Sequence, residues 1–199
     1  MEKEKPVQEK IARCIRSVGQ MDKVKLHLAC GERYIPGYIH IDIRNFPHID
    51  YIMEVDNLCE FDDNSVDHIY ASHILEHFGR HEVLDVLKEW YRVLKEEGTL
   101  RVAVPDFEAI CRAYRTFEDI TLVMGPLHGG QDYPSNTHYV SFDFKYLSEL
   151  LKQVGFKCIR RYDWRYTIHK DYDDFSQSYL PHMDKKDGIL ISLNVEATK

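Results

Sequence analysis

Residues 25–42 read KLHLACGERYIPGYIHID, and this stretch decides the fold. Apolar and polar residues alternate along 25–28, which is the pattern of a strand with one buried face. This strand leads into small residues at 29–31, and a second apolar strand ends at Asp42. A strand, a tight turn and an acid at the end of the next strand are how an α/β sheet holds a nucleoside. Small side chains let a ligand approach the main chain, and the carboxylate can accept hydrogen bonds from ribose hydroxyls.

The connection between these two strands is unusually short. Seven residues separate Gly31 from Ile39, whereas a helical crossover between parallel strands needs about a dozen. The sequence therefore predicts a loop or one helical turn there. A helix expected at 6–18, between Pro6 and Gly19, could cover that face of the sheet instead.

The composition favours one domain spanning residues 1–199. The formal net charge is −7 and no basic stripe is present, which disfavours a nucleic-acid partner. The chain has neither a long apolar run nor a signal-peptide pattern, so we expect no membrane partner. Five cysteines without a CxxC pair predict reduced thiols and a cytoplasmic location. Two of them, Cys111 and Cys158, look like small buried residues.

Strands and helices alternate along the chain. Helices are also expected at 82–95 and at 144–154, the latter capped by Asp143 and closed by Gly155. This order predicts an α/β fold, a Rossmann-like three-layer sandwich with a mostly parallel sheet. No helix separates the last two strands, so one strand should be antiparallel. The predicted strands are 24–29, 39–43, 50–53, 66–71, 99–104, 156–161 and 189–195.

Four blocks together carry a family resemblance: LHLACGERYIPGYIHID (26–42), FDDNSVDHIYASHILEH (61–77), LKEWYRVLKEEGTLRVAVPDFEAI (87–110) and GGQDYPSNTHYVSFDFKYLSELLKQVGF (129–156). Their order resembles the class I S-adenosylmethionine-dependent methyltransferases, in particular small bacterial members of the methyltransferase type 11-like group. The resemblance implies a seven-stranded sheet of order 3-2-1-4-5-7-6 and S-adenosylmethionine as cofactor.

The resemblance also implies roles for single residues. The turn at 29–31 would pass under the amino-acid portion of the cofactor, and Asp42 would hold the ribose. Residues 56–58 would read the adenine edge, and Ser72 with His73 would face the methionine part. The turn departs from the family, which often has an acid at the position of His27 and a glycine at that of Ala29. The cofactor-binding candidates are His27, Ala29, Cys30, Gly31, Asp42, Asp56, Asn57, Leu58, Ser72 and His73.

Two other readings compete with parts of this one. HILEH at 73–77 fits the H-x-x-E-H pattern of a group of zinc peptidases, in which His73 and His77 would share zinc on one helix face. Glu76 would then be the general base. The longer methyltransferase block accounts for the same residues, so no metal is expected, and Glu76 and His77 would hold the helix after the fourth strand. Cys30 could be a nucleophile at a helix start, although a small packing residue is more common there.

Segments 124–140 and 163–187 are expected to be irregular and to roof a pocket at the carboxyl ends of the strands. Their aromatic residues could equally pack the loops or form a dimer face. Tyr133, His73 and His138 are the catalytic candidates, because a hydroxyl or ammonium acceptor needs a base. We expect methyl transfer to the O or N atom of a small molecule by a monomer or homodimer. The alternative is a binding or regulatory module without catalysis.

Overall fold

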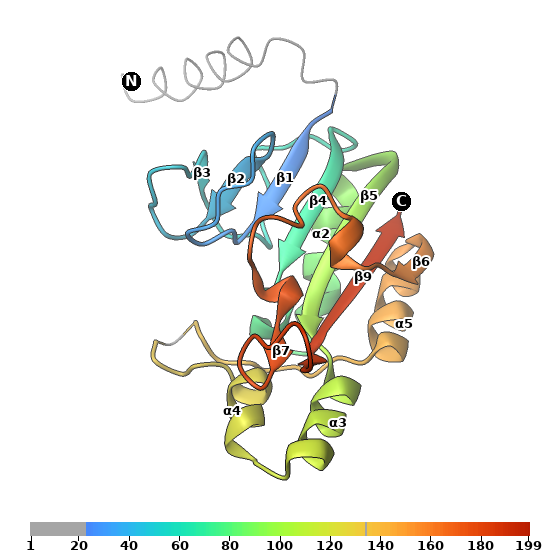
Figure 1. The fold of residues 1–199 in the computed structure, drawn as a ribbon. Coiled ribbons are helices and arrows are strands. Elements are labelled where there is room, and N and C mark those ends of the chain that lie inside the picture. The colour runs from blue at the N-terminus through green and yellow to red at the C-terminus, as the bar shows by residue number, and fades with distance from the viewer. Residues whose placement is uncertain (1–22, 134) are drawn as a thin grey trace.

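The computed structural model describes residues 23–133 and 135–199. Figure 1 shows a central twisted sheet with helices behind it and at its lower edge. The helix predicted at 6–18 and Cys14 lie outside the described residues.

The seven-stranded sheet has the order β3-β2-β1-β4-β5-β9-β6, which confirms the predicted order 3-2-1-4-5-7-6. Strand β9 is antiparallel to both of its neighbours, β5 and β6, and the other pairs are parallel. The strands are β1 (Lys25–Leu28), β2 (Ile39–Asp42), β3 (Tyr51–Ile52), β4 (Val66–Ser72), β5 (Leu94–Pro105), β6 (Lys157–Arg161) and β9 (Ser192–Thr198).

One face of the sheet is apolar and carries the main core. Helices α2 (Val83–Val93) and α5 (Phe144–Val154) pack against this face, and Trp90 of α2 is fully buried. The Trp90 indole donates to Val55 O at 2.8 Å, so its polar atom is paired as well. Asp143 caps α5 and Gly155 ends it with φ 121°, as predicted. A Cβ on Gly155 would lie 3.0 Å from the Tyr91 hydroxyl, so this position requires glycine.

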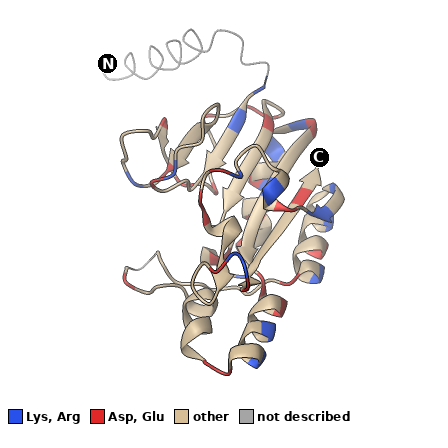
Figure 2. Cartoon of the chain, viewed as in Figure 1, with Lys and Arg blue, Asp and Glu red and all other residues tan. Residues whose placement is uncertain are grey.

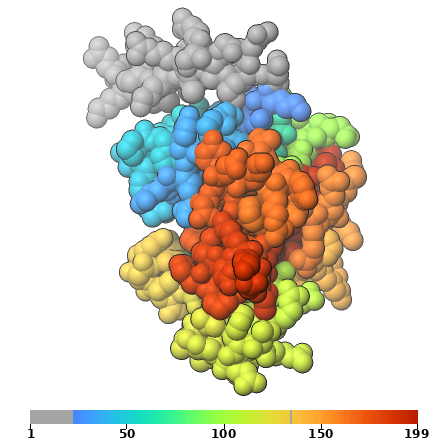
Figure 3. Space-filling model, in the orientation of Figure 1, coloured from blue at the N-terminus to red at the C-terminus, as the bar shows by residue number. Residues whose placement is uncertain are grey.

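The opposite face of the sheet is polar and aromatic. Register pairs of adjacent strands place His27 beside Tyr70, and Ser72 beside Ala103 and then Asn194. The connection 29–38 contains turns but no helix, as predicted, and it cannot cover this face alone. Residues 162–178, with the 3-10 turns η2 (Trp164–Tyr166) and η3 (Phe175–Gln177), cover it instead. Figure 3 shows the orange segment over the centre of the molecule.

Two helices lie beyond the carboxyl ends of the parallel strands (Figure 1). Helix α3 (Phe107–Phe117) begins after Asp106, whose carboxylate caps it, and α4 (Thr121–His128) packs against it. A two-stranded sheet, β7 (Tyr179–Leu180) and β8 (Ile189–Leu190), lies next to them. Helix α4 differs from the irregular start expected for segment 124–140. It forms despite Pro126 because Val123 packs into the small core shared with α3.

Three other expectations need correction. The predicted strand 189–195 is split, because the main chain of Ile191 bonds to Ser178 and Asp106 instead of continuing one ladder. Cys111 is exposed because α3 buries the face that contains Ala109, Ile110 and Ala113. Cys158 is exposed in an edge strand with φ 49°, where the pairing register shifts.

The charged residues of the two signs are interspersed along the outer helices in the view of Figure 2. None of the helices among the described residues is both long and apolar enough to span a lipid bilayer.

Candidate functional site

The turn after β1 is joined directly to the acid at the end of β2. Asp42 is 3% exposed, and its Oδ2 accepts from Gly31 N at 2.8 Å. Its Oδ1 accepts from Arg44 N at 2.8 Å. Since parallel strands end at the same edge of a sheet, the structure brings together the two halves of the predicted nucleoside site.

The backbone of this turn is left-handed at two positions. Gly31 has φ 58°, and a Cβ there would lie 3.3 Å from Nη2 of Arg44. Ala29 has φ 49°, a region that glycine enters without cost. Burial, and then Asp42, raise the pKa of the Cys30 thiol to about 12. A nucleophilic cysteine needs the opposite shift, so Cys30 is a packing residue of this turn.

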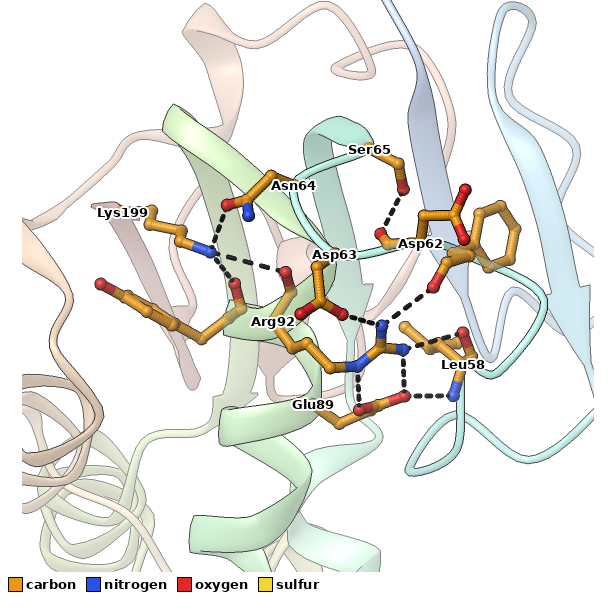
Figure 4. Close-up of polar contacts among 10 residues, drawn as sticks. Leu58, Asp62, Asp63, Asn64, Ser65, Glu89, Arg92 and Lys199 are labelled. Atoms are coloured by element: carbon orange, nitrogen blue, oxygen red, sulfur yellow. Dashed lines mark hydrogen bonds and ion pairs between the residues drawn. The ribbon is translucent and has the colours of Figure 1, made fainter.

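The acidic segment after β3 is fastened to helix α2 (Figure 4). Arg92 donates to both oxygens of Glu89 at 2.8 Å, to Asp63 Oδ1 at 2.6 Å and to the carbonyls of Phe61 and Leu58. Glu89 in turn accepts from Leu58 N at 2.7 Å. The main-chain N–H of Leu58 is therefore occupied, and its side chain is fully buried. Asp56 and Asn57, the other predicted adenine contacts, are exposed on the same segment.

His73 follows β4 and is held by two neighbours from different elements. Its Nε2 lies 3.0 Å from the Ser192 hydroxyl, and its Nδ1 lies 3.2 Å from Oε1 of Glu76. The backbone of His73 has φ 54°, and its N–H donates to Ala103 O. The preceding Ser72 has a buried hydroxyl with no hydrogen-bond partner among the described residues. Both predicted residues thus lie at the carboxyl end of β4.

Glu76, His77 and His138 form a second cluster at this edge. The structure has a 3-10 turn, η1 (Leu75–His77), where a helix carrying His73 and His77 on one face was expected. His77 therefore lies beside His138, with ring centroids 4.8 Å apart, and not beside His73. Burial opposes ionisation of Glu76, but His73 and His77 lower its pKa, so it is a carboxylate. Burial lowers the pKa of His138 against the opposing charge of Glu76.

Segment 163–187, the covering segment, places an aromatic ring next to His73. Phe175 is 54% exposed, and its ring centroid lies 5.5 Å from that of His73. The guanidinium of Arg33 lies 5.0 Å from the same ring, and Arg33 Nε donates to Asp173 O at 2.9 Å. The outline of the molecule in Figure 3 is indented on one side, between the blue-to-cyan residues and the yellow-orange residues that follow α4.

Two predicted residues lie elsewhere. Tyr133 is 46% exposed in the loop after α4, and among the described residues it makes no ring contact or side-chain hydrogen bond with His73 or His138. His27 is buried under Tyr38 and Tyr70 on the polar face of the sheet. Burial, and then His40, lower the pKa of His27 well below its usual value. His27 is thus a buried residue of the polar face, and its predicted role as a cofactor contact stays a prediction.

Two polar residues of β9, Ser192 and Asn194, support His73 and were not among the predicted site residues. Ser192 donates to Asn194 Oδ1 at 3.1 Å, and Asn194 Nδ2 donates to Ser176 O at 2.9 Å. These two polar residues alternate with the buried Ile191, Leu193 and Val195. Polar residues at every second position of a buried strand indicate a second, polar face, which is the signal that could have revealed them.

The chain was compared with known proteins. Residues 36–102 match the family model described as a methyltransferase domain, and no curated protein matches the chain. A SAM-dependent methyltransferase from Archaeoglobus fulgidus is similar in structure at 13% identity, with TM-score 0.56, covering 97% of this chain and 94% of that one. Another from Methanosarcina mazei has 18% identity, TM-score 0.56 and coverages of 94% and 96%.

A third similar structure was solved with ligands. It is the 1,6-didemethyltoxoflavin-N1-methyltransferase of Burkholderia thailandensis, with bound 1,6-didemethyltoxoflavin and S-adenosylhomocysteine. It shares 14% identity with this chain, with TM-score 0.55, and the match covers 97% of this chain and 77% of that one. At these identities the three structures establish the fold.

Proposed function

We propose that the chain is a class I S-adenosylmethionine-dependent methyltransferase and that it transfers a methyl group from S-adenosylmethionine to a small-molecule acceptor. The observation that carries the proposal is the buried carboxylate of Asp42, bonded to Gly31 N at the carboxyl ends of β1 and β2. A buried carboxylate at this position supports the proposal, because it could accept hydrogen bonds from ribose hydroxyls beside a turn whose main chain a ligand can approach.

The residues at this edge fit the cofactor. Each Asp42 oxygen accepts from one backbone N–H, and a carboxylate has about four lone-pair sites, so two remain for ribose hydroxyls. Gly31 presents no side chain, and the Ser72 hydroxyl is buried without a partner at the end of β4. Ala29, Cys30, Gly31 and Ser72 would border the amino-acid portion of the cofactor. Asp56 and Asn57 would supply polar contacts to the adenine, and Leu58 would supply packing.

When bound, the cofactor supplies an electrophilic methyl group on a sulfonium, which leaves as a neutral thioether without needing a proton. The residues of the chain therefore have to orient the acceptor and exclude water. Phe175 is positioned for this, because the covering segment holds its ring beside His73, and Arg33 lies against the same ring. The enclosure would depend on residues far from the turn in sequence.

A hydroxyl or ammonium acceptor must also lose a proton, and His73 is the base that we propose. To act as the base, His73 would carry its proton on Nδ1, next to Glu76, and Nε2, which faces the Ser192 hydroxyl, would accept the proton of an acceptor that displaces Ser192. The charge of Glu76 would stabilise the imidazolium that forms. His138 is the second candidate, and Tyr133 would need its loop to move inward.

A small molecule is the acceptor that we propose. The similar methyltransferase from Burkholderia thailandensis holds 1,6-didemethyltoxoflavin, and the net charge of −7 on this chain disfavours a nucleic acid. The scattered cysteines support a cytoplasmic location for this reaction.

The first experiment measures binding of S-adenosylhomocysteine by calorimetry. We expect binding by the wild-type protein and at least about a tenfold loss in Asp42→Ala, because an ionised acceptor of two hydroxyl hydrogen bonds is removed. Asp85→Ala is the matched control, since that exposed carboxylate on α2 pairs only with Lys88. Absence of binding at millimolar concentration by the wild-type protein would refute the proposal.

The second experiment separates catalysis from binding. The protein is incubated with radiolabelled S-adenosylmethionine and a panel of hydroxyl and amine metabolites. We expect His73→Asn to bind S-adenosylhomocysteine normally and to transfer methyl at least about a hundredfold more slowly than the wild-type protein. Cofactor binding by the wild-type protein without transfer to any acceptor would instead favour the non-catalytic binding module.

A further inference from the structure

Glu76 has a carboxylate that the protein leaves without hydrogen bonds. The residue is 0% exposed, and among the described residues neither Oε1 nor Oε2 has a hydrogen-bond partner. Nδ1 of His73 lies 3.2 Å from Oε1 but outside hydrogen-bond geometry. A buried carboxylate is costly unless a cation or several donors compensate it.

Two histidines that lie beside this carboxylate are each bonded to a backbone carbonyl through Nδ1. Nδ1 of His77 lies 3.1 Å from Thr137 O, and Nδ1 of His138 lies 3.0 Å from Pro126 O. A carbonyl oxygen can only accept, so both Nδ1 atoms carry a proton. In a neutral imidazole the lone pair is then on Nε2, and a backbone carbonyl on Nδ1–H is the usual way in which proteins orient a histidine that binds a metal.

The three side chains converge on one point. One ligand atom from each of Glu76, His77 and His138 can be chosen so that all lie within 4.8 Å of one another, and Nε2 of His138 lies 4.0 Å from Oε1 of Glu76. The backbone holds this arrangement, because Tyr139 N donates to Glu76 O and His138 N donates to His128 O. The loop after α4 is thereby fixed to the 3-10 turn η1.

We propose that Glu76, His77 and His138 bind a divalent first-row transition-metal ion, with zinc as the reference ion. Two imidazoles and one carboxylate suit zinc, iron(II) or cobalt(II) better than the hard ions calcium and magnesium, which prefer oxygen ligands alone. Three protein ligands leave at least one position for water or another oxygen ligand. Because a carboxylate has two oxygens, Glu76 can bind the ion and still face His73.

This site differs from the zinc reading of HILEH, in which His73 and His77 share the ion. The 3-10 turn directs His73 toward Ser192, and the second imidazole comes from His138, far along the chain. The metal site requires neither the cofactor nor the acceptor. It goes beyond the proposed function, and it replaces the expectation that no metal is bound.

Metal binding is tested on the full chain without cofactor. The protein is stripped with a chelator and then titrated with zinc by calorimetry and with cobalt(II) by visible absorption. We expect one equivalent of ion to bind, with d–d bands in the cobalt spectrum. His77→Ala, His138→Ala and Glu76→Gln should each weaken zinc binding by at least about tenfold. His81→Ala is the control, because this exposed histidine lies outside the cluster and should bind as the wild-type protein does.

The outcomes separate the possibilities. Equal zinc affinity in the wild-type protein and in a folded His77→Ala, His138→Ala double variant would overturn the proposal, and the Glu76 charge would then be balanced by an imidazolium alone. If these variants do not fold, the wild-type protein decides, because absence of cobalt d–d bands overturns the site by itself. S-adenosylhomocysteine binding is measured separately, so its failure would reject the proposed function and leave the metal site standing.

Discussion

At the scale of the residue, the turn at 29–31 should respond in opposite directions to two substitutions. Gly31→Ala puts a side chain on a left-handed residue next to Arg44 and should cost about 1–2 kcal/mol of unfolding free energy. Ala29→Gly relaxes a left-handed alanine, and the gain is offset by the greater freedom of the unfolded chain. We expect it to be neutral or to stabilise by up to about 1 kcal/mol. Urea unfolding of the two variants checks both signs, and equal losses would contradict this account.

Single residues were predictable where a local rule decides them. Asp143 caps α5 and Gly155 ends it, as their residue types require. The exposure of Cys111 was not predictable, because it depends on which face of α3 packs against α4. The exposure of Cys158 follows from the irregular register between β6 and β9, which no residue type in the neighbouring sequence indicates.

At the scale of the element, Arg92 fastens the acidic segment after β3 to α2. Arg92→Lys removes the fork that holds both Glu89 oxygens, because a lysine ammonium cannot make the same planar pair. We expect the free energy of unfolding measured in urea to fall by about 2 kcal/mol. Hydrogen exchange at the Leu58 amide, which donates to Glu89 in the wild-type protein, should become faster. Arg115→Lys on the exposed side of α3 is the control and should change neither quantity. Unchanged exchange at Leu58 in Arg92→Lys would show that the segment is held by other contacts.

Some helices and strands were predictable from the sequence, and others were not. The alternation of strands and helices predicted the mostly parallel sheet, the resemblance implied the strand order, and β9 is antiparallel as expected. Helix α4 was missed because glycine and proline oppose a helix locally, whereas packing of Val123 against α3 stabilises it. The turn η1 was expected to be part of a helix, and its tighter backbone separates His73 from His77. Such outcomes depend on contacts between segments, which a linear pattern does not contain.

At the scale of the whole molecule, the polar face of the sheet should make the protein sensitive to acid. Burial lowers the pKa of His68 to about 3 and that of His169 to about 4, from an ordinary value of 6.5. The unfolded chain therefore takes up protons first as the pH falls. The free energy of unfolding should be at its full value above about pH 6.5. As the pH falls below this value, it should decrease by up to about 1.4 kcal/mol per pH unit for each histidine, until the pKa of that histidine in the folded protein is reached.

Urea unfolding at about pH 7.5 and about pH 5 measures this effect, and we expect these two histidines to cause a loss of about 4 kcal/mol of unfolding free energy. His68→Phe removes one titrating ring from a buried position and should reduce the loss by about half relative to the loss in the wild-type protein. The same pH dependence in both proteins would exclude His68 as a source of acid sensitivity.

The covering of that face also has a consequence for synthesis of the chain. Arg33 bonds to Asp173 across 140 residues, and the Tyr70 hydroxyl donates to Asp174 across 104. A ribosome releases β1, β2 and β4 long before the segment that shields their histidines and tyrosines. Until then, this face of the incomplete sheet exposes a hydrated polar surface and not an apolar one that would favour aggregation. The last contacts to form are those that enclose the binding edge.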